Sequence, residues 1–169
     1  TFMPKNNLLS LEEIARVIKI FNGLGVEKVR ITGGEPLVRR NIDWLFKKIS
    51  EENNLKELTL TTNGSQLKHK AAMLKNSGVE RINISLDSLD PDTFNRMTRI
   101  GKLNEVLEGI QAAKKIGFKK IKLNVVLMKN LNGHEVFNLV NFAIDSGFDI
   151  SFIEEMPLGG TQFNRSETS

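Results

Sequence analysis

Residues 28–36 read Lys-Val-Arg-Ile-Thr-Gly-Gly-Glu-Pro, and no other segment of the 169-residue chain says as much about its architecture. The first five residues alternate polar and apolar side chains, which is the pattern of a β-strand with one buried face. Two glycines, a carboxylate and a proline follow directly. Glycine lets the backbone approach a ligand closely, and Glu35 adds a hydrogen-bond acceptor beside it. The segment therefore predicts a strand that ends in a ligand-binding loop.

Helical and strand patterns alternate on both sides of this loop. Helices are predicted over residues 10–24, 41–51, 66–77, 103–116 and 134–146, with a short turn capped by an aspartate over 90–97. Strands are predicted over residues 28–32, 57–62, 81–86, 121–127 and 150–154. Five strands separated by helices indicate right-handed βαβ units and a parallel sheet, whereas an antiparallel sheet with one wet face would not need the helices.

Both a doubly wound sheet and a part of a barrel fit this order of elements, and the polar residues of the strands favour the barrel. Strands of parallel sheets are usually apolar on both faces. Here period-2 spacing places polar side chains on a single side of each of the first four strands. These residues are Lys28, Arg30, Thr32, Thr59, Thr61, Asn63, Asn83, Ser85, Asp87, Lys122 and Asn124. Polar groups that converge near the carboxyl ends of barrel strands form a binding cavity, and a strand before the first helix would extend the wall.

The composition is that of one globular domain, with 40% hydrophobic residues and a net charge of +4. Lysines fall mainly on predicted helix surfaces, aromatic residues are few and tyrosine is absent, so we expect no DNA-binding surface. No apolar run approaches the ~18 residues of a membrane-spanning helix. The chain has no cysteine, which excludes disulfides and thiolate metal sites within these residues.

Five motifs occur in order along the chain at regular intervals. They are Ile-Thr-Gly-Gly-Glu-Pro-Leu-Val-Arg-Arg (31–40), Leu-Thr-Thr-Asn-Gly (60–64), Arg-Ile-Asn-Ile-Ser-Leu-Asp-Ser-Leu (81–89), Lys-Leu-Asn-Val-Val-Leu (122–127) and Phe-Ile-Glu-Glu-Met-Pro-Leu-Gly (152–159). Together they resemble the molybdenum cofactor biosynthesis protein A family, the radical S-adenosylmethionine (SAM) GTP 3',8-cyclases. The resemblance covers about residues 1–160, and the motif at 81–89 separates this family from most other radical SAM enzymes.

The resemblance implies an α/β fold, an incomplete (βα)6-type TIM-like barrel over residues 1–160 with a loop or disordered tail over 161–169. It implies SAM as cofactor and two [4Fe-4S] clusters, whose cysteines fall outside this chain. It also implies conversion of GTP to (8S)-3',8-cyclo-7,8-dihydroguanosine 5'-triphosphate, which a downstream protein of the pathway carries on to molybdopterin. A cytoplasmic enzyme without DNA or membrane partners, and one that forms a homo-oligomer, is expected.

Matched by position, the resemblance assigns two sets of binding residues. Gly34, Ser85 and Met156 match SAM-binding positions, with Glu35 and Asn63 in support. Arg30, Thr61 and Lys122 match GTP-binding positions, while no residue of the chain matches a catalytic or metal-binding position. One departure is Ser151, where many relatives have an arginine that could help to neutralise the triphosphate.

Charge chemistry gives the GTP set a physical basis, because a triphosphate requires charge-assisted donors in a poorly hydrated cavity. Arg30 offers a planar fork and Lys122 a point charge. Lys28 lies on the same strand face and is a third candidate. The alternative is that these cations simply pair with Glu57, Asp87 or Glu154.

Two other functions remain open from the sequence. One is a different radical SAM enzyme that acts on a peptide or another small molecule. The other is a nucleotide-binding module without a cluster. Cysteine motifs on either side of this segment would distinguish them, because a cluster requires thiolate ligands.

Overall fold

The computed structural model describes residues 8–155 and shows strands and helices in alternation. The strands are β1 (Lys28–Ile31), β2 (Glu57–Thr62), β3 (Val79–Ser85), β4 (Lys120–Leu127) and β5 (Asp149–Glu154). The α-helices are α1 (Leu11–Gly23), α2 (Ile42–Ser50), α3 (Leu67–Asn76), α4 (Pro91–Thr98), α5 (Leu103–Ile116) and α6 (Val136–Ser146). Two short 3-10 helices, η2 (Pro36–Val38) and η3 (Gly133–Glu135), lie in the connections.

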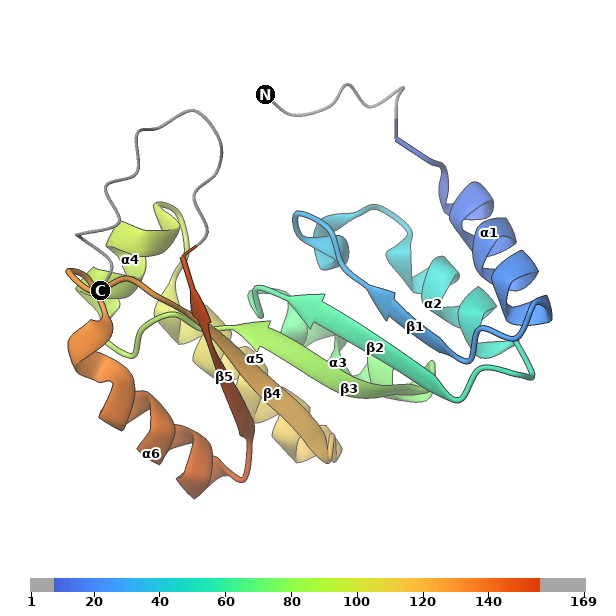
Figure 1. Ribbon diagram of the computed structural model, residues 1–169. Helices are drawn as coiled ribbons and strands as arrows, with labels where there is room; N and C mark the ends of the chain where they lie inside the picture. Colours follow the sequence, from blue (N-terminus) through green and yellow to red (C-terminus); the bar gives the residue numbers. More distant parts are fainter. Residues whose placement is uncertain (1–7, 156–169) are drawn as a thin grey trace.

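The five strands form one parallel sheet in the order β1-β2-β3-β4-β5 (Figure 1). Because each crossover joins adjacent strands in the same direction, right-handed connections place the intervening helices on the same side of the sheet. A doubly wound sheet would reverse its strand order at a switch point, and an antiparallel sheet would not pair in this way. The arrangement is that of a barrel wall, as the polar strand faces predict.

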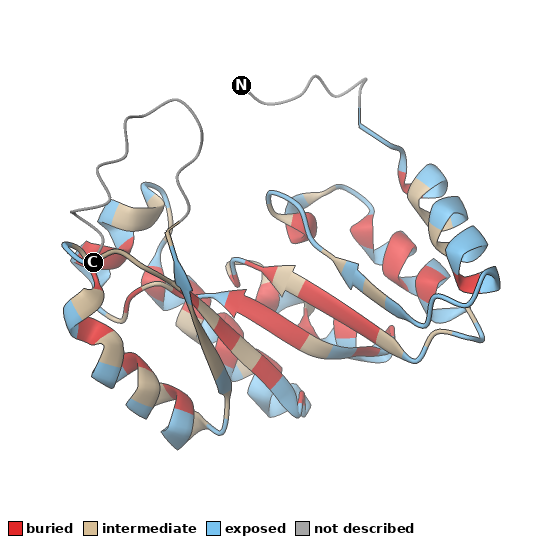
Figure 2. Cartoon of the chain, in the orientation of Figure 1, coloured by how far each residue is buried: buried red, intermediate tan, exposed pale blue. Residues whose placement is uncertain are grey.

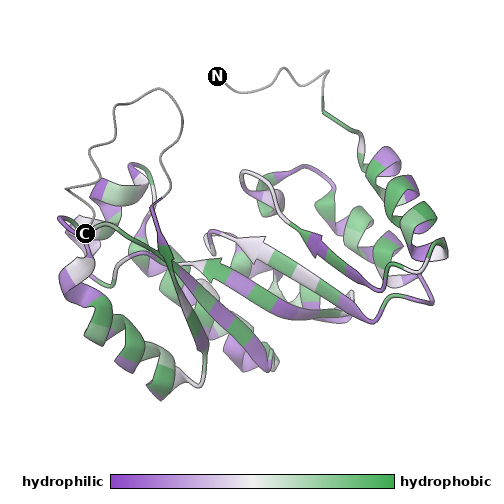
Figure 3. Ribbon diagram, viewed as in Figure 1, coloured by the Kyte–Doolittle hydropathy of each residue, from purple (hydrophilic) through white to green (hydrophobic). Residues whose placement is uncertain are grey.

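The sheet has one apolar face under the helices and one more polar face, which we call the open face. Alternate strand residues such as Leu60, Ile82, Ile84 and Leu123 are fully buried in the main core. Figure 2 shows this burial along β2, β3 and β4, and Figure 3 shows hydrophobic and hydrophilic residues in alternation along the same strands. Period-2 spacing therefore sorts the strand side chains between core and site, as predicted.

Most helix boundaries follow local signals. Ser10 begins α1 through a capping box, in which Glu13 N–H donates to Ser10 Oγ (3.1 Å) and Ser10 N–H donates to Glu13 Oε2 (2.7 Å). Asp90 caps α4 by accepting from Thr93 N–H (2.8 Å). The sequence predicts only a turn here, but the cap and Pro91 at the first position continue it into a helix of two turns.

Both edges of the sheet carry exposed apolar surface. Helix α1 exposes about half of Ile20 and Phe21, and α6 exposes 82% of Phe137. Strand β1 pairs only with β2, and β5 only with β4, within residues 8–155. In that part of the chain no helix has the length and apolarity that crossing a bilayer requires.

Candidate functional site

The Gly-Gly-Glu-Pro loop is fastened to the end of β2 by the Glu35 carboxylate. Its Oε1 accepts hydrogen bonds from Leu37 N–H (3.0 Å) and Thr62 Oγ1 (2.8 Å), and its Oε2 accepts one from Asn63 N–H (2.6 Å). Both oxygens are thus engaged within the protein. Glu35 holds the loop in place, which is a supporting role for the two glycines before it.

Those glycines present bare backbone to open space. Gly33 has a φ of +155°, a conformation that L side chains rarely adopt, so the loop depends on glycine there. A Cβ built on Gly34 meets no other atom within 4 Å. The fold itself therefore does not require a glycine at position 34, and the space beside it is available to a ligand.

Asn63 uses its side chain to close the turn after β2. Its Oδ1 accepts from Ser65 N–H (3.0 Å) and Ser65 Oγ (2.8 Å), and Gly64 follows with a φ of +81°. This is an Asx-type turn, in which the side chain replaces a backbone acceptor. The turn accounts for the asparagine side chain at position 63 without any contact to a ligand. Asn63 supports the site through its backbone N–H, which donates to Glu35.

Parallel pairing aligns polar residues of neighbouring strands into three rows across the open face. The deep row contains Arg30, Thr59, Arg81 and Lys120; the middle row contains Thr61, Asn83, Lys122 and Asp149; the edge row contains Ser85, Asn124 and Ser151. Successive rows are two residues apart along a strand, or about 6.6 Å at a rise of roughly 3.3 Å per residue. The register therefore gives the open face a defined depth.

The two predicted sets of binding residues occupy different depths. Gly34, Glu35 and Asn63 lie in the loops after β1 and β2, and Ser85 lies in the edge row. Arg30, Thr61 and Lys122 lie in the deep and middle rows. Met156 lies outside the described residues. Ser151 belongs to the edge row, so the arginine of many relatives would stand nearer to Ser85 than to Arg30.

Three cations of the open face make no ion pair within residues 8–155. These are Arg30, Arg81 and Lys122, none of which lies within 4.0 Å of a carboxylate there. The alternative that Arg30 and Lys122 pair with strand-end carboxylates is therefore not found in this part of the chain. Such a set of cations on one face favours a polyanionic ligand.

Lys28, in contrast, has a carboxylate partner. Its Nζ lies 3.4 Å from Glu57 Oε2, although 75% of the lysine side chain is exposed. Burial raises the pKa of Glu57, but the hydrogen bonds from Lys28 and Thr59 outweigh it and the net pKa is lowered. The pairing interpretation thus explains Lys28, whereas it does not explain Arg30 or Lys122.

Arg81 and Asn83 were not singled out as binding residues from the sequence, although both belong to the rows. The Nε of Arg81 and the Oδ1 of Asn83 are buried polar atoms that have no hydrogen-bond partner among the described residues. Asn83 Nδ2 donates to Thr61 Oγ1 (3.3 Å), which links it to a predicted GTP position. Buried polar atoms are rarely left unpaired, so two such atoms in adjacent rows mark a place for a ligand. Both residues precede Ser85 at period-2 spacing, which places them on the same strand face, and this spacing was the sequence feature that could have identified them.

Asp87 continues the same strand face two residues beyond Ser85. Burial raises the pKa of its carboxyl group, against the effect of a hydrogen bond from Val126 N–H to Oδ1 (2.7 Å). Within residues 8–155, no group of three or more His, Asp or Glu side chains has the arrangement of a metal site.

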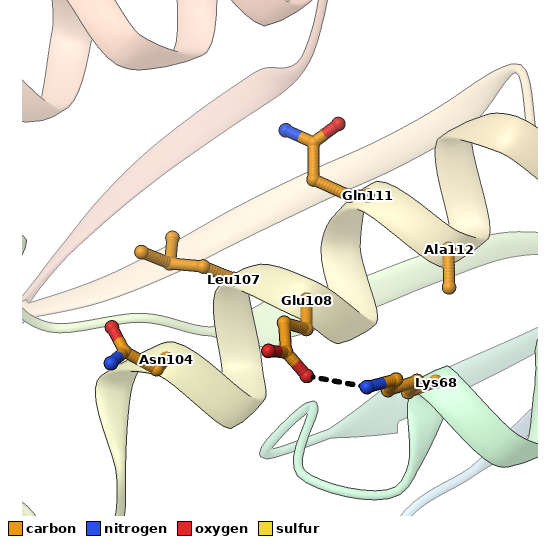
Figure 4. Close-up of a pocket in the computed structure, with 6 residues that line it drawn as sticks. All are labelled: Lys68, Asn104, Leu107, Glu108, Gln111 and Ala112. Carbon is orange, nitrogen blue, oxygen red and sulfur yellow. Dashed lines mark hydrogen bonds and ion pairs between the residues drawn. The ribbon is translucent and has the colours of Figure 1, made fainter.

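A shallow pocket on the helical side contains none of the predicted site residues (Figure 4). It lies between α3 and α5 and is lined by Lys68, Asn104, Leu107, Glu108, Gln111 and Ala112. The Lys68 Nζ and Glu108 Oε2 atoms are 2.8 Å apart across it. Its two charged groups neutralise each other, so the candidate site remains the open face.

The chain is similar to known proteins over almost its whole length. The chain is 51% identical to GTP 3',8-cyclase 2 of Pseudomonas aeruginosa over 98% of its own length and 50% of that protein. It is 52% identical to GTP 3',8-cyclase of Rhizobium etli over 99% of its length and 48% of that protein. The chain thus spans about half the length of these relatives, to which it is homologous.

Solved structures and a family model extend the comparison. SuiB of Streptococcus suis superposes with a TM-score of 0.77 at 23% identity, over 92% of this chain and 36% of that one. This likeness supports the fold, a partial TIM-like barrel, and confirms that prediction. The Radical SAM superfamily model matches residues 1–143. Membership of that family implies SAM and an iron–sulfur cluster, although this chain has no cysteine. The chain therefore belongs to the radical SAM superfamily.

Proposed function

We propose that this chain forms the central barrel wall of a GTP 3',8-cyclase in molybdenum cofactor biosynthesis. The observation that carries the proposal is a set of three cations, Arg30, Arg81 and Lys122, which make no ion pair within residues 8–155 and lie below the Gly-Gly-Glu-Pro loop on the open face. Homology to GTP 3',8-cyclases supports the same substrate. A polyanionic nucleotide in the deeper rows and SAM at the edge would use both features.

The residues divide into two groups under this proposal. Gly34 and Ser85 contact SAM at the carboxyl edge together with Met156, while Glu35 and Asn63 keep the loops in position. Arg30, Thr61 and Lys122 bind GTP in the deep and middle rows. Arg81 joins the second group through its unpaired guanidinium in the deep row. Charge-assisted hydrogen bonds from these cations to the triphosphate are stronger than neutral ones, particularly where water is excluded.

SAM and its [4Fe-4S] cluster, when bound, supply the radical chemistry that converts GTP to the 3',8-cyclo product. This chain contributes binding, orientation and exclusion of water, since it holds no cysteine. Cysteines outside these residues would ligate that cluster and a second one. The cyclic triphosphate product is then the substrate of the next protein in molybdopterin synthesis.

Calorimetric titration of two variants of the complete enzyme tests the division of the site. Lys122→Ala should weaken GTP binding by about 1.5–3 kcal/mol, the scale of a hydrogen bond to a charged group, and leave SAM binding nearly unchanged. Gly34→Val should do the reverse. Because no protein atom lies within 4 Å of a Cβ at position 34, the valine can fill ligand space without displacing the fold.

Lys115→Ala is a matched control, because it removes the same charge from an exposed position on α5. It should change neither affinity. Equal loss of GTP and SAM affinity in Lys122→Ala would contradict the proposed division. Tight SAM binding without any GTP binding by the wild-type enzyme would instead point to a radical SAM enzyme with another substrate.

A further inference from the structure

A buried carboxylate lies at the carboxyl edge, on the side of the site opposite the half-buried Glu35. Glu135 is 4% exposed and ends the 3-10 helix η3 between β4 and α6. Its Oε1 accepts from Ser88 Oγ (2.6 Å), and its Oε2 accepts from Leu89 N–H (2.8 Å) and Asp90 N–H (3.2 Å). One side chain thus satisfies three donors from a segment 45 to 47 residues earlier in the chain.

Asn132, three residues before Glu135, holds the other end of that segment. The residue is fully buried, and its Nδ2 donates to Asp87 O (2.6 Å) and Val126 O (2.9 Å). Its Oδ1 accepts from Met128 N–H (2.8 Å), so its amide is engaged at both ends. The turn at residues 132–135, which we call the anchor turn, therefore grips residues 87–90 at two points.

The gripped segment is the direct continuation of β3 past the edge row. The regular pairing of β3 with β4 ends at Ser85 and Asn124, after which one more backbone bond runs from Leu86 N–H to Asn124 O (3.1 Å). Beyond that point, hydrogen bonds to side chains take the place of backbone pairing between the strands. Asp87 Oδ1 accepts from Val126 N–H, and the anchor turn binds residues 88–90 through Glu135. Asp90, at the end of the segment, then caps α4.

We infer that Glu135 and Asn132 are positioning residues, which fix the end of β3 so that Ser85 presents its hydroxyl to SAM. This inference rests on the proposed function and deepens it, since it assigns the SAM half of the site a support from residues that lie outside the five sequence motifs. A buried carboxylate is tolerated only when its hydrogen bonds are complete, and these three bonds specify one conformation of the segment. Loss of the carboxylate leaves Leu89 N–H without its acceptor and reduces Ser88 Oγ and Asp90 N–H to their bonds with one another's residue, Ser88 Oγ to Asp90 O (3.1 Å) and Asp90 N–H to Ser88 Oγ (3.0 Å). The segment must then shift for Leu89 N–H to reach water.

Two substitutions of Glu135 separate its geometry from its charge. Glu135→Ala removes all three acceptor contacts. Glu135→Gln can retain them, because the Ser88 hydroxyl lies 3.1 Å from Asp90 O and can donate there while it accepts from the new amide. Ser88→Ala is a milder variant that keeps the test decisive if Glu135→Ala does not fold.

Hydrogen exchange of the complete enzyme without ligands tests the anchoring itself. In Glu135→Ala, exchange of the amides of residues 86–90 should rise about tenfold or more, while the interior of β3 at residues 79–84 stays protected. Ser88→Ala should show a smaller rise in the same amides, and Glu135→Gln should stay close to the wild type. Unchanged exchange at residues 86–90 in Glu135→Ala would overturn the inference, whatever the protein binds.

Binding measurements under anaerobic conditions test the consequence for the site. Glu135→Ala should weaken SAM binding about tenfold or more and change GTP binding less than about threefold, because displacement of one binding group by about an ångström is costly. Glu135→Gln should restore SAM affinity. Leu74→Ala, which removes a fully buried side chain of α3, is the control for general destabilisation and should not affect SAM selectively.

The outcomes distinguish a failure of this inference from a failure of the proposed function. If Glu135→Ala lost SAM and GTP affinity equally, or if Leu74→Ala lost as much SAM affinity, Glu135 would be only structural and the inference would be wrong. If the wild-type enzyme bound no SAM, the proposed function would fail at that point. The hydrogen-exchange result would then still decide whether the anchor turn holds the end of β3.

Discussion

Glu35 and Glu135 have the same role at two places on the carboxyl edge. Each carboxylate accepts three hydrogen bonds, and each joins a loop to a neighbouring strand end or turn. Carboxylates suit this role because two oxygens can accept several donors at once. Their partners lie 27 or more residues away, except for the local bond from Leu37 to Glu35, so sequence patterns cannot reveal them.

Removal of the Glu35 carboxylate should destabilise the protein through the donors that it leaves unpaired. Glu35→Ala deprives Leu37 N–H, Asn63 N–H and the Thr62 hydroxyl of their acceptor, and we expect a loss of about 1–3 kcal/mol in the free energy of unfolding. Urea unfolding measures it. Glu51→Ala, which breaks only an exposed pair with Lys48, is the control and should lower the free energy of unfolding much less than Glu35→Ala. Equal effects of the two substitutions would contradict the role of Glu35 in holding the loop to the end of β2.

Asp87 should make the protein less stable as the pH rises. Burial raises the pKa of this carboxyl group in the folded state above its ordinary value of 3.8. The folded state then binds more protons than the unfolded state between the two pKa values, so the free energy of unfolding falls as the pH increases through that window. Asp87→Asn keeps an oxygen for Val126 N–H and removes the charge. It should remove this fall and stabilise the protein at neutral pH.

Urea unfolding of wild type and Asp87→Asn at several pH values between about 3.5 and 7.5 gives the comparison. The difference between the two proteins should grow with pH and level off above the folded-state pKa. A constant difference across the range, or a variant that is less stable at neutral pH, would show that the folded protein prefers the charged form of Asp87.

At the scale of elements, periodic patterns were readable and irregular ones were not. The strand at 57–62 and the helix at 103–116 coincide with β2 and α5, because each repeats one period over several residues. The 3-10 turns η2 and η3 were missed since they depend on side-chain bonds to distant backbone, and α6 accordingly begins at Val136 rather than at residue 134.

The same distinction applies to the candidate site. Period-2 spacing was sufficient to place Arg30, Thr61 and Lys122 on one face. It could not give the register between strands, which decides that Asn83 stands between Thr61 and Lys122. The unpaired Nε of Arg81 could not be predicted for the same reason, because the absence of a partner within residues 8–155 is a property of the assembled sheet. Sequence patterns gave the face of each residue, and strand pairing gave its neighbours.

The exposed edge of β1 should cause self-association of the 169-residue chain. A strand with one free side presents unpaired backbone groups that can pair with another copy. We expect dimers or larger species in sedimentation velocity at high protein concentration. Phe21→Glu, which reduces the exposed apolar surface of α1, separates two causes. Association through the strand should persist in this variant; a wild-type monomer at every concentration would contradict the prediction.

At the scale of the whole molecule, the chain carries the proposed nucleotide-binding residues but no cysteine. Anaerobic reconstitution of the 169-residue chain with iron and sulfide should therefore yield no stoichiometric [4Fe-4S] cluster, because the chain has no cysteine to supply a thiolate. Iron and sulfide analysis measures this, together with an assay for 5'-deoxyadenosine, which should not form. The complete enzyme is the positive control. Four irons and four sulfides per chain would show that other residues ligate a cluster.

The strand order has a consequence for how the protein is made. Each strand pairs with the strand immediately before it in the chain, from β1 through β5. As the polypeptide leaves the ribosome, each new strand can therefore pair with the strand that was made just before it. Strand pairing in this sheet requires no segment that is distant in the chain. Such a chain can grow unit by unit during translation, with short loops to close at each step. The sheet would then form from β1 to β5, in the order in which the strands are synthesised.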